Sequence, residues 1–334
     1  MSLSIIIVNY RAADHICNCL QSAAAFDWFR RFEWIVVDND SGDDSRERIL
    51  SRYPFVRWID MGYNAGFARA NNAGMKTATG NMLLLLNPDT LCIDDSVAAC
   101  FQRLQQSSCV AAGVQLLNRN REPEISGSKF VKGGMNHLLP IPYWGGLIRR
   151  LAYTLKTPAP HVKKAAAVQE VDWISGAFLM VKRSAVEQAG MMDEDFFLYG
   201  EEVEWCSRLR KTGSLCIFGD LSIIHLEGAA IDERLQVNEK GYYNLYDRKG
   251  LQLMVSNHLR VRKQYGAGWY LFLLLNYSWG VLFYAVCSTV HRLLLLQNPL
   301  PHWKKVMQFG RNVCRLWTLM PRMLANRPYF YKMF

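Results

Sequence analysis

The chain has 334 residues, of which 50% are apolar and 20% are charged. This is an ordinary globular composition, sufficient for one large domain or two smaller ones. Residues 1–239 carry 25 Lys and Arg against 28 Asp and Glu, whereas residues 240–334 carry 14 against 1, so the basic excess lies entirely in the C-terminal part. The nine cysteines include no CxxC pair, which argues against a zinc-binding cluster and predicts reduced thiols.

The N-terminal part alternates predicted strands and helices. Strands are expected at residues 5–8, 34–37, 56–60, 82–86 and 110–117, and helices at residues 14–25, 45–52, 65–77 and 94–106. Gly80 is the expected stop signal of the third helix. The strand-helix-strand order predicts a parallel sheet.

The periodic pattern lapses in residues 119–168, which are rich in Gly, Pro and basic pairs. A loop of this length in a globular domain is usually functional or disordered. We expect a mobile flap on the acceptor side, that is, the side of the functional site where the acceptor of a transferred group would bind. A plain disordered insertion is the alternative. Order returns with a strand at residues 171–181 that is interrupted at Ser175. Helices at residues 184–189 and 202–211 and a strand at residues 214–218 follow.

The C-terminal region 240–334 is predicted to be helical and membrane-associated. Its segment from Trp269 to His291 has 23 residues without a formal charge, and basic residues stand on both sides. Its apolar content favours an anionic membrane surface over nucleic acid as the partner. A span, an embedded interfacial helix and a buried core helix all remain open, and Trp269 and Trp303 are candidate interfacial anchors.

The first residues run directly into an apolar segment that is too short, and too poor in basic residues, for a signal peptide. We therefore expect the catalytic part at the cytoplasmic face of the inner (plasma) membrane.

Three apolar runs, at residues 35–37, 83–86 and 196–200, each end on carboxylates. Ligands of open α/β sheets bind at the carboxyl ends of the strands, so the acids that follow these runs should converge on one site. Such a site suits a nucleotide and a metal.

Each cluster has a functional and a purely structural interpretation. Asp38 and Asp40 could accept hydrogen bonds from a base and a ribose, or Asp40 could merely cap the next helix. The glycines at 62 and 66 could allow a diphosphate to approach a helix N-terminus, or could only shape a turn.

Further along, Asp89 is a candidate ligand of a hard divalent cation, and His225 could join it or be structural. Glu201, Glu202 and Glu204 could supply a general base, or could only complement a helix dipole.

Six short segments occur in a fixed order: SIIIVNY at 4–10, VVDNDS at 36–41, GYNAGF at 62–67, LNPD at 86–89, SGA at 175–177 and FLYGEEVE at 197–204. Together they resemble the inverting family 2 glycosyltransferases of the GT-A fold, and especially their rhamnosyltransferase-like bacterial branch. The resemblance implies an α/β fold with a Rossmann-like nucleotide-sugar-binding sheet over residues 1–239. The basic, apolar, helical, membrane-associated segment 240–334 would follow it.

The resemblance also implies roles for single residues. The implied donor-binding residues are Asn9, Asp38, Asp40, Asn64, Gly66, Gly176 and Ala177, the last two beneath the transferred sugar. Asp89 is similar to the last acid of the family's DXD metal motif, whose first acid is replaced here by Asn87, and His225 would join it in binding Mg²⁺ or Mn²⁺. Glu202 stands where the family has its catalytic Asp, with Glu201 as the alternative base.

The implied reaction is inverting transfer of a sugar from a dTDP- or UDP-linked donor to a lipid-linked saccharide acceptor in surface polysaccharide synthesis, with dTDP-rhamnose as the favoured donor. In this reaction the base deprotonates the acceptor hydroxyl as it attacks the anomeric carbon. A sugar-phosphate nucleotidyltransferase is a second possibility, but residues 9–13 lack the Gly-rich basic loop such enzymes use. A third is an inactive membrane scaffold, which the departures at Asn87 and Glu202 would favour.

Overall fold

The computed structural model describes residues 2–156, 160–226, 244–298 and 300–333. The chain divides into two units, each described below by itself. Unit 1 comprises Met1–Lys129, His161–Phe197 and Glu201–Gln236, and unit 2 comprises Phe130–Pro160, Leu198–Gly200 and Val237–Phe334. The boundary expected at residues 239 and 240 lies outside the described residues.

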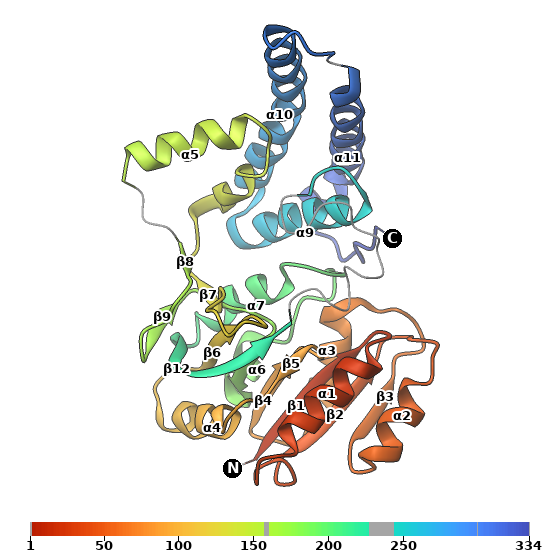
Figure 1. The fold of residues 1–334 in the computed structure, drawn as a ribbon, viewed down its shortest axis with the longest axis vertical. Coiled ribbons are helices and arrows are strands. Elements are labelled where there is room, and N and C mark those ends of the chain that lie inside the picture. The colour runs from red at the N-terminus through yellow and green to blue at the C-terminus, as the bar shows by residue number, and fades with distance from the viewer. Residues whose placement is uncertain (1, 157–159, 227–243, 299, 334) are drawn as a thin grey trace. The chain divides into compact units, whose positions relative to one another are not determined.

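A nine-stranded sheet forms the centre of unit 1, in the order β3-β2-β1-β4-β11-β6-β12-β5, with β9 paired to β12 (Figure 1). The strands are β1 Leu3–Asn9, β2 Glu33–Asp38, β3 Arg57–Asp60, β4 Met82–Leu86, β5 Thr90–Leu91, β6 Ala111–Leu117, β9 Gln169–Val171, β11 Phe178–Lys182 and β12 Leu215–His225. Every residue of β1 and β4 is buried, as expected of strands covered on both faces.

The predicted parallel sheet is confirmed for β3, β2, β1 and β4. Beyond β4 the sheet is mixed, because β11 runs antiparallel to both β4 and β6, while β6 and β12 are parallel to each other. It follows that β1, β2, β4, β6 and β12 all end at one edge of the sheet, and that β11 begins there.

The helices of unit 1 begin and end close to the predicted positions: α1 Ala13–Ala23, α2 Ser45–Arg52, α3 Gly66–Thr77, α4 Ser96–Gln106, α6 Arg183–Ala189 and α7 Glu201–Leu209. The prediction that Gly80 stops the third helix is wrong, because α3 ends at Thr77 and Ala78 is already extended. Gly80 instead allows close backbone approach, since a Cβ there would lie 2.7 Å from the backbone nitrogen of Ser4.

One apolar run and one predicted strand differ in the structure from what the sequence suggested. The third apolar run, residues 196–200, forms no ladder strand, because Tyr199 and Gly200 both have left-handed φ angles, and the run leads directly into α7. The strand expected at residues 171–181 is divided: Val171 ends β9, a short β10 follows at Trp173–Ile174, and β11 begins only after the turn at Ser175–Ala177. In a second, three-stranded sheet, β10 pairs with β7 (Gly127–Ser128), which pairs with β8 (His161–Val162).

The segment 119–168, expected to lack regular structure, contains several short elements. Besides β7 and β8 it forms the 3-10 segment η1 (Lys132–Leu138) and helix α5 (Trp144–Thr154). Its two ends belong to unit 1 and its middle to unit 2. Its mobility and its place on the acceptor side stay predictions.

Unit 2 is helical, as expected of the C-terminal region. Its long helices are α9 Arg248–Tyr265, α10 Ala267–Leu294 and α11 Leu300–Ala325. The Tyr277 hydroxyl of α10 donates to the backbone oxygen of His137 in η1 at 2.8 Å, and the Trp144 indole of α5 donates to Asn276 Oδ1 at 3.3 Å. Across both units all nine cysteines are free, in agreement with the expected reduced thiols.

Helix α3 begins against the segment that precedes α7. The Phe67 backbone N–H donates to the oxygen of Phe197 at 2.8 Å. Gly66 has a φ of +77°, and a Cβ on it would lie 2.3 Å from that same oxygen. The approach of α3 to residue 197 therefore requires glycine at position 66.

We predict that Gly66→Ala destabilises the fold by about 2–5 kcal/mol, because it combines left-handed strain with overpacking. Gly62→Ala is the matched control: its φ is also positive, at +72°, but a Cβ there would meet nothing within 4 Å. Its cost should stay near the strain term of about 1–2 kcal/mol. Urea unfolding followed by tryptophan fluorescence measures both, and equal losses would contradict the steric account.

Candidate active site

Asn9 fastens the ends of β1 and β2 together. It pairs with Asp38, the last residue of β2, and its side chain is fully buried. The amide nitrogen donates to Asp38 Oδ1 at 2.7 Å and to Ser41 Oγ at 2.9 Å, while its oxygen accepts from the Ala12 N–H at 3.0 Å. The polar atoms of Asn9 are thus engaged within the fold, and they fix the position of the Asp38 carboxylate.

Asn39, which sequence analysis did not single out, connects this corner to helix α3. Its buried side chain donates to Asn64 Oδ1 at 3.2 Å and accepts from the Ala65 N–H at 2.8 Å. The structure therefore brings Asp38 and Asn64 into one network, next to the start of α3 at Gly66. The sequence feature that could have indicated Asn39 is its position between Asp38 and Asp40.

Asp40 differs from its neighbours in this corner. It is exposed and has a left-handed φ of 65°. Its expected contact with a donor stays a prediction.

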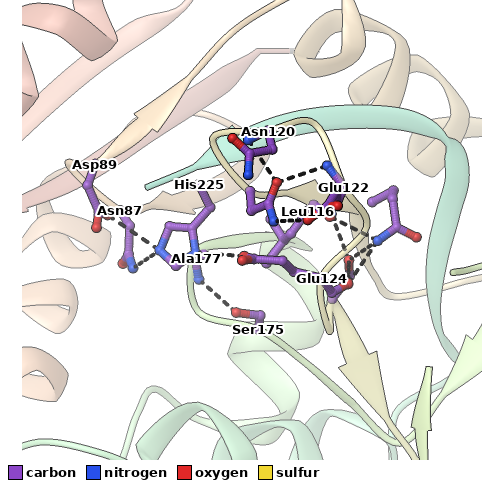
Figure 2. Close-up of polar contacts among 12 residues, drawn as sticks. Asn87, Asp89, Leu116, Asn120, Glu122, Glu124, Ser175, Ala177 and His225 are labelled. Atoms are coloured by element: carbon purple, nitrogen blue, oxygen red, sulfur yellow. Dashed lines mark hydrogen bonds and ion pairs between the residues drawn. The ribbon is translucent and has the colours of Figure 1, made fainter. Parts of the chain in front are cut away.

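A second cluster follows β4. Asp89 is 6% exposed, and its Oδ1 lies 3.5 Å from Nε2 of His225, the last residue of β12. The Asn87 amide nitrogen lies 3.4 Å from the same ring nitrogen, as Figure 2 shows. The pairing of β12 with β5, in which His225 is opposite Thr90, creates this contact.

Electrostatics keep Asp89 in its ionised form. Burial would raise the pKa of this carboxyl, but the hydrogen bond and charge of His225, together with a backbone hydrogen bond within Asp89 and the charge of His15, outweigh burial and hold the pKa below its ordinary value. Asp89 is therefore an acceptor-only group at neutral pH, as a ligand for a hard cation must be.

These residues fit a divalent cation with few protein ligands. Metal-ligand bonds of about 2.1 Å allow one Mg²⁺ to contact two atoms that are 3.5 Å apart, as Asp89 Oδ1 and His225 Nε2 are. Among the described residues no group of three or more His, Cys, Asp or Glu side chains could hold a metal. The remaining coordination positions would then fall to water and to the phosphates of a ligand, an arrangement typical of Mg²⁺.

Glu124 faces the other nitrogen of the His225 ring, and sequence analysis missed it. Its Oε2 lies 4.0 Å from His225 Nδ1, on the side away from Asp89 (Figure 2). The Glu124 N–H donates to Leu116 O at 2.9 Å and the Gln115 amide donates to Glu124 O at 2.8 Å, which hold this loop to β6. No local motif marks Glu124, because only the fold brings residues 124 and 225 together.

The third cluster joins α7 to the turn before β11. A Cβ on Gly176 would lie 3.7 Å from Glu202 Cγ and 3.6 Å from Cε1 of Phe67, so these side chains flank the glycine. Ala177 is linked to the second cluster, because its backbone oxygen accepts from the Asn87 N–H at 3.0 Å. The expected sugar-contacting residues therefore lie between Asp89 and Glu202.

The three acids of α7 have different environments. Glu201 is buried, Glu202 is partly exposed, and buried Glu204 forms an ion pair with Arg208 at 2.8 Å. Glu204 thus contributes to the structure of α7 and α6, since Arg208 also donates to the backbone oxygen of Ala189. Glu202 is the acid with access to solvent beside Gly176.

The matching family profile covers residues 4–157 and is described as glycosyl transferase family 2. Residues 4–157 of the chain therefore match this family. Similar proteins include the low-salt glycan biosynthesis hexosyltransferase Agl10 of Haloferax volcanii, which is 28% identical over 63% of this chain and 62% of its own length. The N-acetylglucosaminyl-diphospho-decaprenol L-rhamnosyltransferase of Mycobacterium tuberculosis is 28% identical over 65% of this chain and 73% of its own length. The chain therefore spans less than two thirds of the first of these relatives.

The fold of the chain also matches a solved structure. The mannosyltransferase PcManGT from Pyrobaculum calidifontis, in complex with GDP-Man and Mn²⁺, aligns with a TM-score of 0.50 and 15% identity over 95% of this chain and 87% of that chain. This likeness bears on the fold alone and agrees with the mixed α/β sheet described above.

We predict that Asn9→Ala lowers the stability of unit 1 by about 2–4 kcal/mol, because it leaves buried hydrogen-bonding partners unsatisfied. Asn18→Ala, at an exposed position of α1, is the control and should change stability by less than about 0.5 kcal/mol. Calorimetric titration with UDP and dTDP should also show weaker binding for Asn9→Ala. Equal stability of the two variants would contradict the fastening role.

Proposed function

We propose that this chain transfers a sugar from a nucleotide-sugar donor to an acceptor hydroxyl with inversion at the anomeric carbon. The observation that carries the proposal is the convergence, at one edge of the sheet, of three clusters centred on Asp38, on Asp89 with His225, and on Glu202. They follow in the order in which a nucleotide, a diphosphate and a sugar with its acceptor would need them.

The donor would lie along the first two clusters. Asp38, held by Asn9, can accept from a pyrimidine imide or a ribose hydroxyl through charge-assisted hydrogen bonds. The N-terminus of α3, which begins at Gly66 beside Asn64, offers the partial positive charge of the helix dipole to the diphosphate.

The leaving group would be held by Asp89 and His225. Mg²⁺ or Mn²⁺ bound there would stabilise the negative charge that develops on the departing diphosphate. Glu124, facing Nδ1, is a positioning residue that keeps the other ring nitrogen directed at the Asp89 side.

The acceptor would be activated by Glu202. A carboxylate beside Gly176 lies where the transferred sugar is expected, and it can take the proton from the attacking hydroxyl. Glu201 is the alternative base, but its side chain is buried.

The finer assignment is transfer of rhamnose from dTDP-rhamnose to a lipid-linked saccharide, in surface polysaccharide synthesis at the cytoplasmic face of the plasma membrane. Support comes from the mycobacterial relative, whose name specifies L-rhamnose and a diphospho-decaprenol acceptor. The long apolar helix α10 of unit 2 is in keeping with a membrane-bound acceptor.

A donor screen tests the proposed reaction. With Mg²⁺ or Mn²⁺ present, the purified chain should release dTDP or UDP from at least one nucleotide sugar. Chelation should suppress the release, and Asp89→Asn should lower it at least about a hundredfold. Asp94→Asn, at an exposed loop position, is the control and should keep full turnover. Release of pyrophosphate would indicate nucleotidyl transfer, and silence across the panel would favour the inactive scaffold.

The base is tested by comparing the three acids of α7. Glu202→Gln should lower kcat by about 10²–10⁴ with donor affinity unchanged, because only proton transfer is lost. Glu204→Gln should mainly lower the unfolding midpoint, since it weakens the ion pair with Arg208. Near-normal kcat in Glu202→Gln, together with an inactive but folded Glu201→Gln, would reassign the base to Glu201.

A further inference from the structure

Helix α10 presents a continuous apolar face to solvent. Six side chains spaced three or four residues apart form this face, here termed the α10 stripe, and each is between 50% and 63% exposed: Leu275, Trp279, Leu282, Val286, Val290 and Leu293. Such spacing places all six on one side of the helix. Soluble monomers rarely expose so long an apolar surface unless something covers it.

Within the described residues, α10 is the one helix long and apolar enough to cross a bilayer, and only 33% of its apolar window is buried. Length and composition alone therefore leave two arrangements open. The helix could cross the membrane, or it could lie along one surface. Its neighbour α11 decides between them.

Helix α11 lies beside α10 in antiparallel direction (Figure 1). The Trp317 indole donates to Ser278 Oγ at 2.8 Å, and the rings of Tyr277 and Phe309 are 6.0 Å apart. Phe309 and Tyr277 are both buried by this contact. Because the contacts join the middle parts of both helices, α10 cannot enter the hydrocarbon along its full length without α11.

Exposed basic residues occur along the whole of α11: Lys304, Lys305, Arg311, Arg315 and Arg322. Arg311 and Arg315 stand near the middle of the helix, where each would cost about 2.5–3.5 kcal/mol in a spanning arrangement. No acid on α11 could neutralise them. The paired helices are therefore unsuited to crossing, although α10 alone is long enough.

We propose that the α10–α11 pair lies in the plane of an anionic bilayer surface, with the α10 stripe in the lipid and the basic side chains among the headgroups. Unit 2 carries 18 Lys and Arg against 2 Asp and Glu, which suits anionic lipid and disfavours a second copy of the same charge. The proposal deepens the proposed function, because a lipid-linked acceptor would be presented at that surface.

Helix α5 of the same unit has matching chemistry. Leu147 and Leu151 are exposed one turn apart, and Arg149 and Arg150 stand between them. The ring of Trp144 contacts Phe283 of α10 at 5.6 Å, so α5 is attached to the proposed membrane-binding helix.

Vesicle flotation of the full chain tests the surface. The chain should float with vesicles of phosphatidylcholine mixed with phosphatidylglycerol, and more weakly with phosphatidylcholine alone. The double variant Leu282→Asp with Val286→Asp should bind at least about tenfold more weakly. Val168→Asp in unit 1, where the native side chain is 63% exposed, is the control and should bind normally.

Labelling of a cysteine in the turn after α10 tests the orientation. Leu296 is 97% exposed, so Leu296→Cys, in a background with Cys109, Cys287 and Cys314 changed to Ser, should react with an impermeant maleimide. In oriented membrane vesicles it should be labelled from the same face as a Val168→Cys reference in unit 1. Labelling of position 296 from the opposite face alone would overturn the proposal in favour of a span.

The remaining outcomes are also decisive. The proposal would be overturned if the unchanged chain forms a dimer in solution, does not bind vesicles, and loses the dimer in the double variant. The α10 stripe would then be a contact with a second copy of the chain. Equal flotation with both vesicle types would overturn its electrostatic part. Nucleoside diphosphate release with a water-soluble acceptor should be the same in the double variant and the unchanged chain. If the unchanged chain binds vesicles but releases no nucleoside diphosphate, the proposed function is rejected. The proposed membrane-binding surface is then still supported.

Discussion

The contact between Asp89 and His225 is the interaction on which the candidate site depends. Two polar side chains, far apart in sequence and both largely buried, meet because β12 pairs with the short strand β5 directly after the turn that carries Asp89. Burial of either group alone would be costly, and their mutual attraction offsets that cost. A hydrogen bond from the Asn87 backbone N–H to the Ala177 oxygen also holds this turn. It links the position of Asp89 to that of Gly176, which lies beside Glu202.

The sequence supports the N-terminal half of the fold well. Strands β1, β2 and β4 are short apolar runs bounded by polar residues, and the helices between them have clear periodicity. The hydrophobic pattern therefore predicted the alternation of strands and helices along the chain, and with it the parallel direction of these strands. The site residues at strand ends followed too, because the parallel topology fixes which ends share an edge. Asp38, Asp89 and His225 were predicted as site residues in this way, whereas Asn64 was named only through the resemblance to family 2 glycosyltransferases.

What the sequence could not provide depends on long-range contacts. Glu124 stands in a segment without periodicity, and only the pairing of β6 with β12 brings it to His225. Asn39 could be taken for a spacer between two acids until its bonds to residues 64 and 65 were seen. The run at residues 196–200 has strand-like composition, but the left-handed angles at Tyr199 and Gly200, which composition does not reveal, turn it toward α7.

The path of the chain between the two units has a consequence for dissecting the protein. Residues 130–160 and 198–200 belong to the helical unit although they interrupt the sequence of the other. Cutting the gene after the last strand would thus not release a self-sufficient catalytic fragment: α5 and η1 would lose the partners that Trp144 and His137 have on α10. The segments of the two units therefore alternate along the chain, and exchange of the C-terminal tail between homologous enzymes would have to include residues 130–160 as well.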